Sequence, residues 1–276
     1  MATPRLDRVR LPGVLGEILV DVRAGTRGAP LPVVVLVHGF KGFKDWGFFP
    51  LLADRLARAG FGVVSYNTSG SGINDAGEMA YPDRFARNTF SAELADLETV
   101  MDAVNRGALG LPAPTSLGFL GHSRGGGMAI LAAARRPEVK ALVTWAAIAS
   151  TSRWSEEMQR RWRAQGHLEV RNQRTGQVPP LYPDILDDIA RHAEALDIAG
   201  AASRLTIPWL IAHGTVDETV KLGEAEALAE ANPAAETLYL PQAGHTFGAT
   251  HPLGQRSPAL AALLDASVGF LTRHLT

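Results

Sequence analysis

Short apolar runs alternate with longer helical patterns along most of this chain, and this alternation leaves few folds open to it. Residues 32–37 form a continuous apolar run, as in a strand that is covered on both faces. Residues 46–59 place apolar side chains at helical spacing up to Gly60, and residues 61–66 form a second buried run. Strands separated by helices predict a mostly parallel sheet with helices on both faces.

The same pattern recurs further along the chain. After Pro12-Gly13, residues 17–22 are typical of a strand in an N-terminal hairpin. No unit of 20 to 50 residues repeats, which excludes solenoids and propellers. The remaining predicted strands are 115–120, 139–146, 208–212 and 236–240, and the remaining predicted helices are 91–105, 124–135, 221–231 and 257–271.

Residues 150–205 interrupt the alternation. Two short helical patterns, 155–165 and 183–195, flank a turn-rich stretch, and the segment is short and polar. We therefore predict a cap insertion at 150–205 on an α/β core formed by 1–149 and 206–276. Trp154 and Trp162 are expected to pack this cap onto the core. The arginines of 153–174 are interpreted as a solvated helix face, with guidance of an anionic substrate as the alternative.

Composition excludes several function classes. The 276 residues include no cysteine, which rules out disulfides, thiolate metal sites and a cysteine nucleophile. A net charge of −1 argues against nucleic acid or an anionic membrane as partner. The histidines do not show metal-ligand spacing and no phosphate loop is present, so we expect neither metal nor cofactor. Residues 1–13 contain no apolar secretory core, and a cytoplasmic location is the default expectation. The sequence indicates no oligomeric state.

Residues 121–125 carry the strongest functional signal and read Gly-His-Ser-Arg-Gly. They follow a predicted strand and open a predicted helix, which is the context that a G-x-S-x-G nucleophile motif requires. Such a turn strains the backbone at Ser123 and presents its hydroxyl at a helix N-terminus, where developing negative charge is favoured. We therefore predict that Ser123 is a nucleophile. The alternative is an ordinary turn between a strand and a helix.

A serine hydroxyl needs a base and an orienting acid, which should follow it in the order acid, histidine. Asp217 comes after the predicted strand 208–212, and its neighbour Glu218 is a substitute candidate. His245 comes after the predicted strand 236–240, and His251 is its rival. Because these loops leave the same edge of a parallel sheet, we predict a triad of Ser123, Asp217 and His245.

Acyl transfer also requires two hydrogen-bond donors for the developing oxyanion. The backbone N–H of Arg124, directly after the nucleophile, is one candidate. The second should come from the loop after residues 32–37, where Gly39 permits a close approach and the Phe40 N–H is our candidate. We interpret His38 in this loop as structural.

Four segments in this order resemble the α/β-hydrolase superfamily: residues 38–40 (His-Gly-Phe), 121–126 (Gly-His-Ser-Arg-Gly-Gly), 213–220 (His-Gly-Thr-Val-Asp-Glu-Thr-Val) and 244–245 (Gly-His). Within it the chain is similar to bacterial esterases of the dienelactone-hydrolase, cinnamoyl-esterase and prolyl-oligopeptidase-like branch. The resemblance implies an eight-stranded α/β-hydrolase sheet, an acyl-enzyme mechanism, no cofactor and a mainly helical cap after the sixth strand. The missing cysteine argues against dienelactone hydrolysis itself.

The sequence thus predicts a serine esterase for small to medium acyl esters, with a small-molecule ester as the partner. One alternative keeps the triad but cleaves peptides or amides, as in the prolyl-oligopeptidase-like branch. A second alternative is a non-catalytic relative that binds a ligand on the same fold. A complete Ser, Asp and His set argues against this last alternative, because binding alone does not require it.

Overall fold

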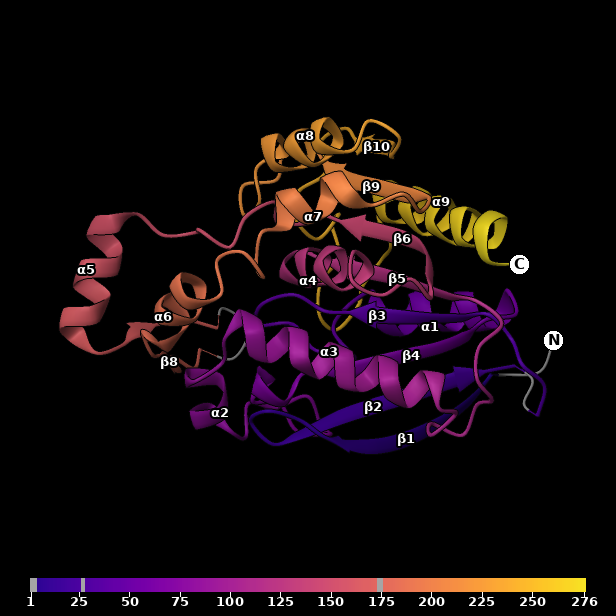
Figure 1. Cartoon of the computed structure of the whole chain (residues 1–276), viewed down its shortest axis with the longest axis horizontal. Helices are drawn as coiled ribbons and strands as arrows, with labels where there is room; N and C mark the ends of the chain where they lie inside the picture. The colour runs from indigo at the N-terminus through magenta and orange to yellow at the C-terminus, as the bar shows by residue number, and fades with distance from the viewer. Residues whose placement is uncertain (1–3, 26–27, 173–175) are drawn as a thin grey trace.

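A computed structural model describes residues 4–25, 28–172 and 176–276 of the chain. Its centre is an eight-stranded sheet with the strand order β1-β2-β4-β3-β5-β6-β9-β10 (Figure 1). The hairpin strands pair antiparallel, and all pairs from β4 to β10 are parallel. The strands are β1 (Arg5–Pro12), β2 (Glu17–Ala24), β3 (Val33–Val37), β4 (Gly62–Asn67), β5 (Leu117–His122), β6 (Val139–Trp145), β9 (Trp209–Gly214) and β10 (Glu236–Leu240). The predicted fold class is confirmed.

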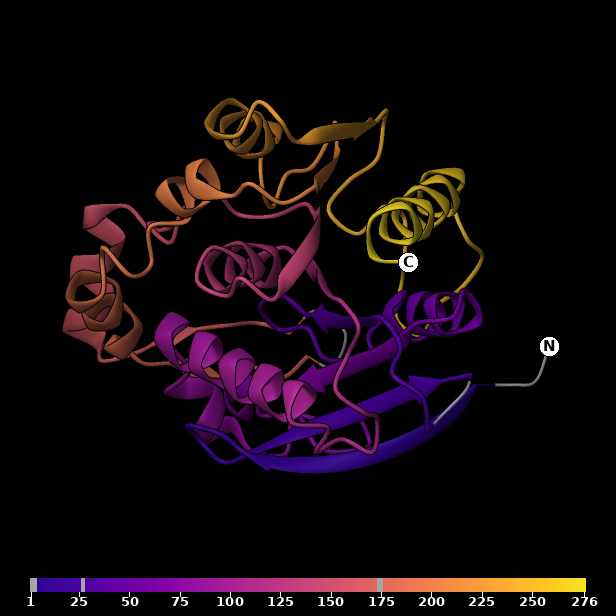
Figure 2. The same ribbon diagram turned by 45° about the vertical axis from the view of Figure 1, so that its right-hand side comes forward.

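Helices cover both faces of this sheet because its inner strands are apolar on both sides. All five residues of β3 and all six of β5 are buried. Two separate hydrophobic clusters fill the two faces. One face is covered by α1 (Phe49–Arg58) and α9 (Pro258–Leu275), and the other by α3 (Phe90–Asn105), α4 (Arg124–Ala133), α7 (Ile198–Arg204) and α8 (Leu222–Ala231) (Figure 2).

Several element boundaries differ from the sequence predictions. The helix predicted from residue 46 begins at Phe49, with a proline in its first turn. Proline suits that position because the first helical amides have no partner within the helix. Strand β5 runs to His122, two residues beyond its predicted end, and carries the chain directly into the motif at Ser123. The short helices α2 (Pro82–Ala86) and α7 were not predicted.

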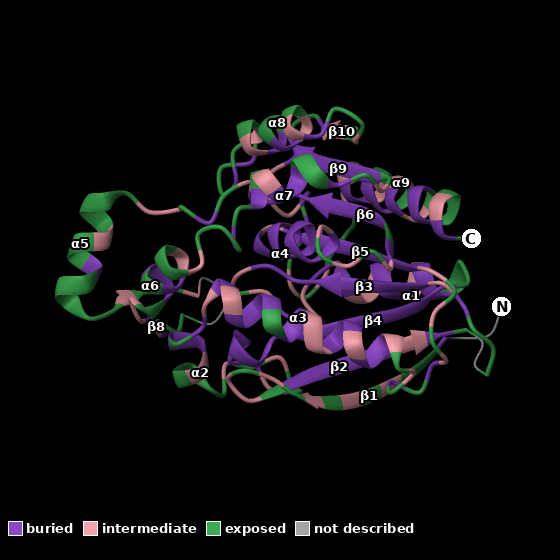
Figure 3. Cartoon of the chain, viewed as in Figure 1, coloured by how far each residue is buried: buried purple, intermediate pink, exposed green. Residues whose placement is uncertain are grey.

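The segment 150–205 holds the remaining elements. These are α5 (Glu156–Gln165), β7 (Leu168–Glu169), β8 (Pro180–Leu181), α6 (Asp184–Arg191) and α7. The Trp162 indole N–H donates to the Leu181 carbonyl at 2.7 Å, and the Trp154 ring packs edge-on against Trp162 at 5.1 Å. Helix α5 stands away from the sheet and is mostly exposed (Figure 3). The division of the chain into core and cap stays a prediction, and Arg174 lies outside the described residues.

The helices in the described ranges are at most 18 residues long, a length that α9 reaches. None of them combines the length and the apolar character required to cross a bilayer.

Candidate active site

Ser123 stands on a strained turn between β5 and α4. Its backbone has φ 57° and ψ −123°, in a region that non-glycine residues rarely adopt. The Ser123 N–H donates to the Trp145 carbonyl at 2.8 Å and so holds the turn against β6. A Cβ at Gly121 would lie 2.4 Å from the Gly125 carbonyl oxygen, and one at Gly125 would lie 2.3 Å from the His38 carbonyl oxygen. Only glycine fits at these two places, so the motif follows from local packing.

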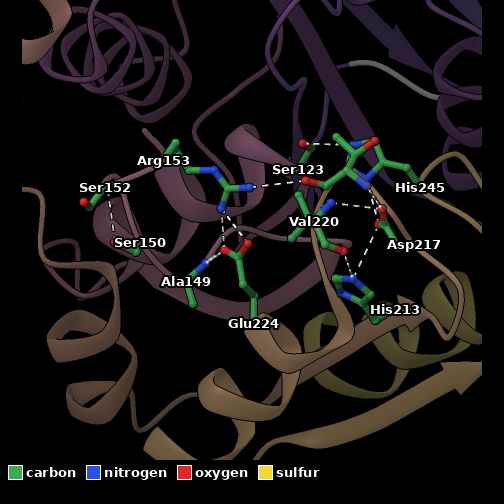
Figure 4. A network of polar contacts seen from close by, with 11 residues as sticks. Ser123, Ala149, Ser150, Ser152, Arg153, His213, Asp217, Val220, Glu224 and His245 are labelled. Atoms are coloured by element: carbon green, nitrogen blue, oxygen red, sulfur yellow. Dashed lines mark hydrogen bonds and ion pairs between the residues drawn. The ribbon is translucent and has the colours of Figure 1, made fainter. Parts of the chain in front are cut away.

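The structure brings Ser123, His245 and Asp217 into one hydrogen-bonded chain (Figure 4). His245 Nε2 lies 3.0 Å from the Ser123 Oγ, and His245 Nδ1 lies 2.7 Å from the Asp217 Oδ2. The carboxylate can only accept, so Nδ1 carries the proton and Nε2 is free to accept one from the serine. This is the tautomer that a general base requires. The three residues come from the loops after β5, β9 and β10, at the same edge of the sheet.

The Asp217 side chain is buried and fully bonded. Its Oδ1 accepts from the Thr219 and Val220 amides at 2.8 Å and 3.0 Å. Burial acts to raise the pKa of Asp217, but the hydrogen bonds from His213, His245 and the Val220 amide together outweigh it and hold the pKa below its ordinary value. The carboxylate therefore stays charged beside His245. Glu218, the substitute candidate, is exposed and takes no part in the hydrogen bonds that join Ser123, His245 and Asp217.

His213 also contacts this carboxylate, a contact that sequence spacing did not reveal. The ring is fully buried, and its Nε2 lies 2.9 Å from the Val220 carbonyl and 3.4 Å from the Asp217 Oδ2. Both neighbours are acceptors, so Nε2 carries the proton. His213 thereby helps to hold the loop that carries Asp217. Its position four residues before Asp217 is the only signal that the sequence contained.

His122 lies against His245. Its Nε2–H donates to the His245 carbonyl at 3.0 Å, and the two ring centroids are 4.8 Å apart. Burial, aided by the nearby His245, lowers the pKa of His122 to about 3. His122 is therefore neutral in the folded protein near neutral pH and supports the backbone of His245.

This buried histidine makes stability depend on pH. The pKa of His122 lies below the ordinary 6.5, so the unfolded chain binds one more proton between about pH 6.5 and 3, and the free energy of unfolding falls as pH falls through that window. From pH 7 to pH 5, we expect His122→Gln to lose about 2 kcal/mol less unfolding free energy than the wild type. Urea unfolding at both pH values measures this difference. An equal pH dependence in the two proteins contradicts the burial of a neutral His122.

His251, the rival base, occupies a different place. Its Nδ1 accepts from the Gly47 amide at 3.0 Å, and its ring lies edge-on to Phe43 at 5.0 Å and stacked near Trp46 at 6.3 Å. It lines the same cavity as the serine, but His245 and not His251 lies within hydrogen-bond distance of Ser123. The structure therefore gives His251 the geometry of a cavity wall.

The two predicted oxyanion donors lie on either side of Ser123. Phe40 sits in the turn closed by the Gly42 amide and the Gly39 carbonyl at 2.9 Å, and a Cβ on Gly39 would lie 2.9 Å from the Ser123 Cβ. Arg124 is the first residue of α4. Within the ranges that the structure describes, neither the Phe40 nor the Arg124 amide donates a hydrogen bond to another protein group. Both donors are thus free for a ligand.

His38 holds this turn in place, as the sequence interpretation expected. Its Nδ1–H donates to the Gly39 carbonyl at 2.9 Å, and its Nε2 accepts from the Thr68 amide at 3.3 Å. Burial lowers the pKa of His38, which keeps the ring neutral. The imidazole therefore ties the turn to the chain segment that follows β4.

A cavity of about 310 Å³ opens over the serine. Half of its described lining residues carry aromatic or imidazole rings, and among these lining residues Lys41 carries a charge. The described part of the chain contains no group of three or more histidine and acidic side chains arranged to hold a metal. The lining residues are Gly39, Phe40, Lys41, Gly42, Trp46, Phe49, His122, Ser123, Asn172, His245, Thr246 and His251.

The chain matches a known protein family. The family model described as serine aminopeptidase, S33, matches residues 28–178, which is more than half of the chain. The chain belongs to the serine aminopeptidase S33 family of α/β-hydrolases. This match confirms the resemblance to the α/β-hydrolase superfamily that the sequence motifs indicated.

One curated relative and many solved structures are similar to this S33 family member. The 2,6-dihydropseudooxynicotine hydrolase of Paenarthrobacter nicotinovorans is 25% identical over 233 residues, which cover 79% of this chain and 54% of the relative. The chain therefore spans about half the length of that relative. Est1E from Butyrivibrio proteoclasticus, solved with ferulic acid bound, is 19% identical with a TM-score of 0.72 over 93% of this chain and 95% of its own.

A peptidase shares the same architecture. The acylaminoacyl peptidase of Pyrococcus horikoshii is 16% identical with a TM-score of 0.72, over 100% of this chain and 42% of its own. At these identities the solved structures show a shared fold. The chemistry of this α/β-hydrolase must therefore be argued from its own site.

Proposed function

We propose that the protein is a serine esterase, which hydrolyses carboxylic esters of small to medium acyl groups through an acyl-enzyme on Ser123. The observation that carries the proposal is the hydrogen-bonded series Ser123–His245–Asp217, in which His245 lies 3.0 Å from the serine Oγ and 2.7 Å from the aspartate Oδ2. Two free backbone N–H donors lie beside it. A pure binding protein has no use for this alignment. The non-catalytic alternative is therefore disfavoured.

The proposed reaction has two halves. His245 Nε2 takes the Ser123 proton while Oγ attacks the ester carbonyl, and Asp217 stabilises the imidazolium that forms. The Phe40 and Arg124 amides hold the oxyanion of the tetrahedral intermediate. His245 then gives its proton to the departing alcohol oxygen, which leaves the acyl group on Ser123. Water then attacks the acyl carbonyl while it gives a proton to His245, and His245 passes this proton to the Ser123 Oγ as the acyl–Oγ bond breaks and the carboxylic acid leaves.

The cavity favours an ester over a peptide with a free amino terminus. An aminopeptidase must bind the α-ammonium group of its substrate, which calls for a carboxylate near the scissile bond. Among the described residues that line this cavity there is no aspartate or glutamate, and Lys41 would repel an ammonium group. The rings in its wall instead suit a neutral or aromatic acyl group. Ferulic acid, which is bound to the structurally similar Est1E, is an aromatic acid of this kind. Amide cleavage remains the second candidate because the family description names an aminopeptidase.

The acid of the triad offers a matched test of this proposal. With p-nitrophenyl esters as substrates, we expect Asp217→Asn to lower kcat by about 10⁴-fold, because the amide favours the wrong tautomer of His245. Glu218→Gln, one residue away and exposed, should stay within about threefold of the wild type. Initial rates on a p-nitrophenyl ester series measure both variants.

The same assay separates ester from amide cleavage. Aminoacyl p-nitroanilides are run beside the esters, and the wild type should cleave the esters with the higher kcat/KM. Faster cleavage of the anilides would contradict the esterase proposal and favour a peptidase or amidase. A large loss in Glu218→Gln with a small one in Asp217→Asn would move the acid to Glu218.

A further inference from the structure

The Arg124 side chain is buried next to the nucleophile turn and pairs with a buried carboxylate. Only 6% of it is exposed, and its Nη1 donates to the Glu93 Oε1 at 3.2 Å. Glu93 is also buried, lies in the first turn of α3, and accepts a hydrogen bond from the Asn88 side-chain amide at 2.6 Å. A buried charge pair of this kind is costly to form, so its position next to Ser123 calls for an explanation.

The same guanidinium lies between two aromatic rings. Its central carbon is 4.1 Å from the centre of the Phe40 ring and 4.4 Å from that of Phe90. Phe40 in turn stacks on Phe85 of α2 at 5.5 Å. A planar, delocalised cation can stack in this way, whereas a lysine ammonium is a point charge. One side chain thus joins the oxyanion turn, the nucleophile turn and the start of α3.

We propose that the Arg124 side chain is a positioning residue for the oxyanion hole, which it holds in register by clamping the Phe40 ring against α3. The inference rests on the proposed function. The two backbone donors come from Phe40 and Arg124, and the side chains of these same two residues are in direct contact. A shift of the Phe40 ring therefore moves its amide relative to the Arg124 amide. Donors must lie within about 3 Å of the oxyanion, so small displacements weaken transition-state binding.

Two variants separate this role from simple core packing. Arg124→Lys keeps a cation for Glu93 and removes the planar stack. The double variant Arg124→Met with Glu93→Gln removes the pair without leaving a buried charge, in case the single change does not fold. Arg136→Lys is the matched control, because Arg136 pairs with Glu98 of α3 at 3.0 Å, beyond the far end of α4.

The measurements are kcat and KM on a p-nitrophenyl ester, the inhibition constant of a boronic acid that forms a tetrahedral adduct with the serine, and the thermal midpoint. We expect kcat of Arg124→Lys and of the double variant to fall about 10- to 100-fold, since a misplacement of about 1 Å can cost about 100-fold elsewhere. The boronic acid should lose affinity in proportion, with KM within about twofold. Arg136→Lys should leave all three enzymatic constants unchanged.

A failure of the positioning role of Arg124 can be told apart from a failure of the proposed esterase function. Folded variants that keep kcat within about threefold of the wild type would overturn the positioning role. So would equal losses in kcat/KM and in KM-derived affinity, because uniform binding loss is not an oxyanion effect. If the wild type itself does not cleave esters or bind the boronic acid, the proposed function fails instead.

Discussion

Replacing Ser123 with alanine should abolish ester hydrolysis while leaving the fold intact. The hydroxyl is the atom that attacks, and the loss of a triad serine typically lowers kcat by about 10⁶-fold. The strained backbone at φ 57° is retained, because alanine carries the same Cβ as serine. Steady-state rates on a p-nitrophenyl ester measure the loss, and the thermal midpoint shows whether the fold survives.

A nearby serine supplies the control for this prediction. Ser150 lies in the loop after β6, where its Oγ accepts the Ser152 amide at 3.1 Å, and it makes no contact with His245. Ser150→Ala should therefore retain wild-type turnover. Residual turnover in Ser123→Ala above about 1% of the wild type would contradict the assignment of the nucleophile.

Replacing His245 with alanine should be nearly as severe. Without an acceptor 3.0 Å from Oγ, the serine keeps its proton and the leaving alcohol has no donor. We expect kcat to fall by about 10⁵- to 10⁶-fold, and added imidazole to restore a measurable fraction because the removed ring leaves space beside Asp217. Stopped-time assays at high enzyme concentration give the residual rate.

His251 tests whether the right histidine has been chosen. It lines the cavity but bonds to Gly47, so His251→Ala should change KM by several-fold and leave kcat within about tenfold. If kcat collapses in His251→Ala and survives in His245→Ala, the base has been assigned to the wrong loop.

Much of the fold could be predicted because its signals are local. The β3 run is apolar at every position, and such runs indicate strands covered on both faces. The sequence does not predict helices α2 and α7, because five and seven residues are too few to show a helical period. It predicts the end of β5 two residues early because Gly121 and His122 have the character of turn residues, although both are buried in the strand.

The candidate triad was predictable for a different reason. In a parallel sheet the carboxyl ends of the strands share one edge, so residues that follow separate strands in sequence meet in space. The sequence alone leaves Glu218 as a substitute for Asp217, since neighbouring residues share a loop and only burial separates them.

The supporting residues could not be predicted. The contact of Arg124 with Phe40, Phe90 and Glu93 joins three segments that are far apart in the sequence, and nothing in their spacing signals it. The same holds for His122 against His245. These contacts depend on how elements pack, which a single sequence does not encode in any local pattern.

The most direct test of the account is to identify the residue that carries the covalent intermediate. Diethyl p-nitrophenyl phosphate reacts with an activated serine and leaves a stable phosphoryl group. After inactivation of the wild type, peptide mass spectrometry should find one equivalent of label on Ser123 and none in Ser123→Ala. Inactivation with the label on another residue, or persistent ester turnover in a fully labelled enzyme, would contradict the account.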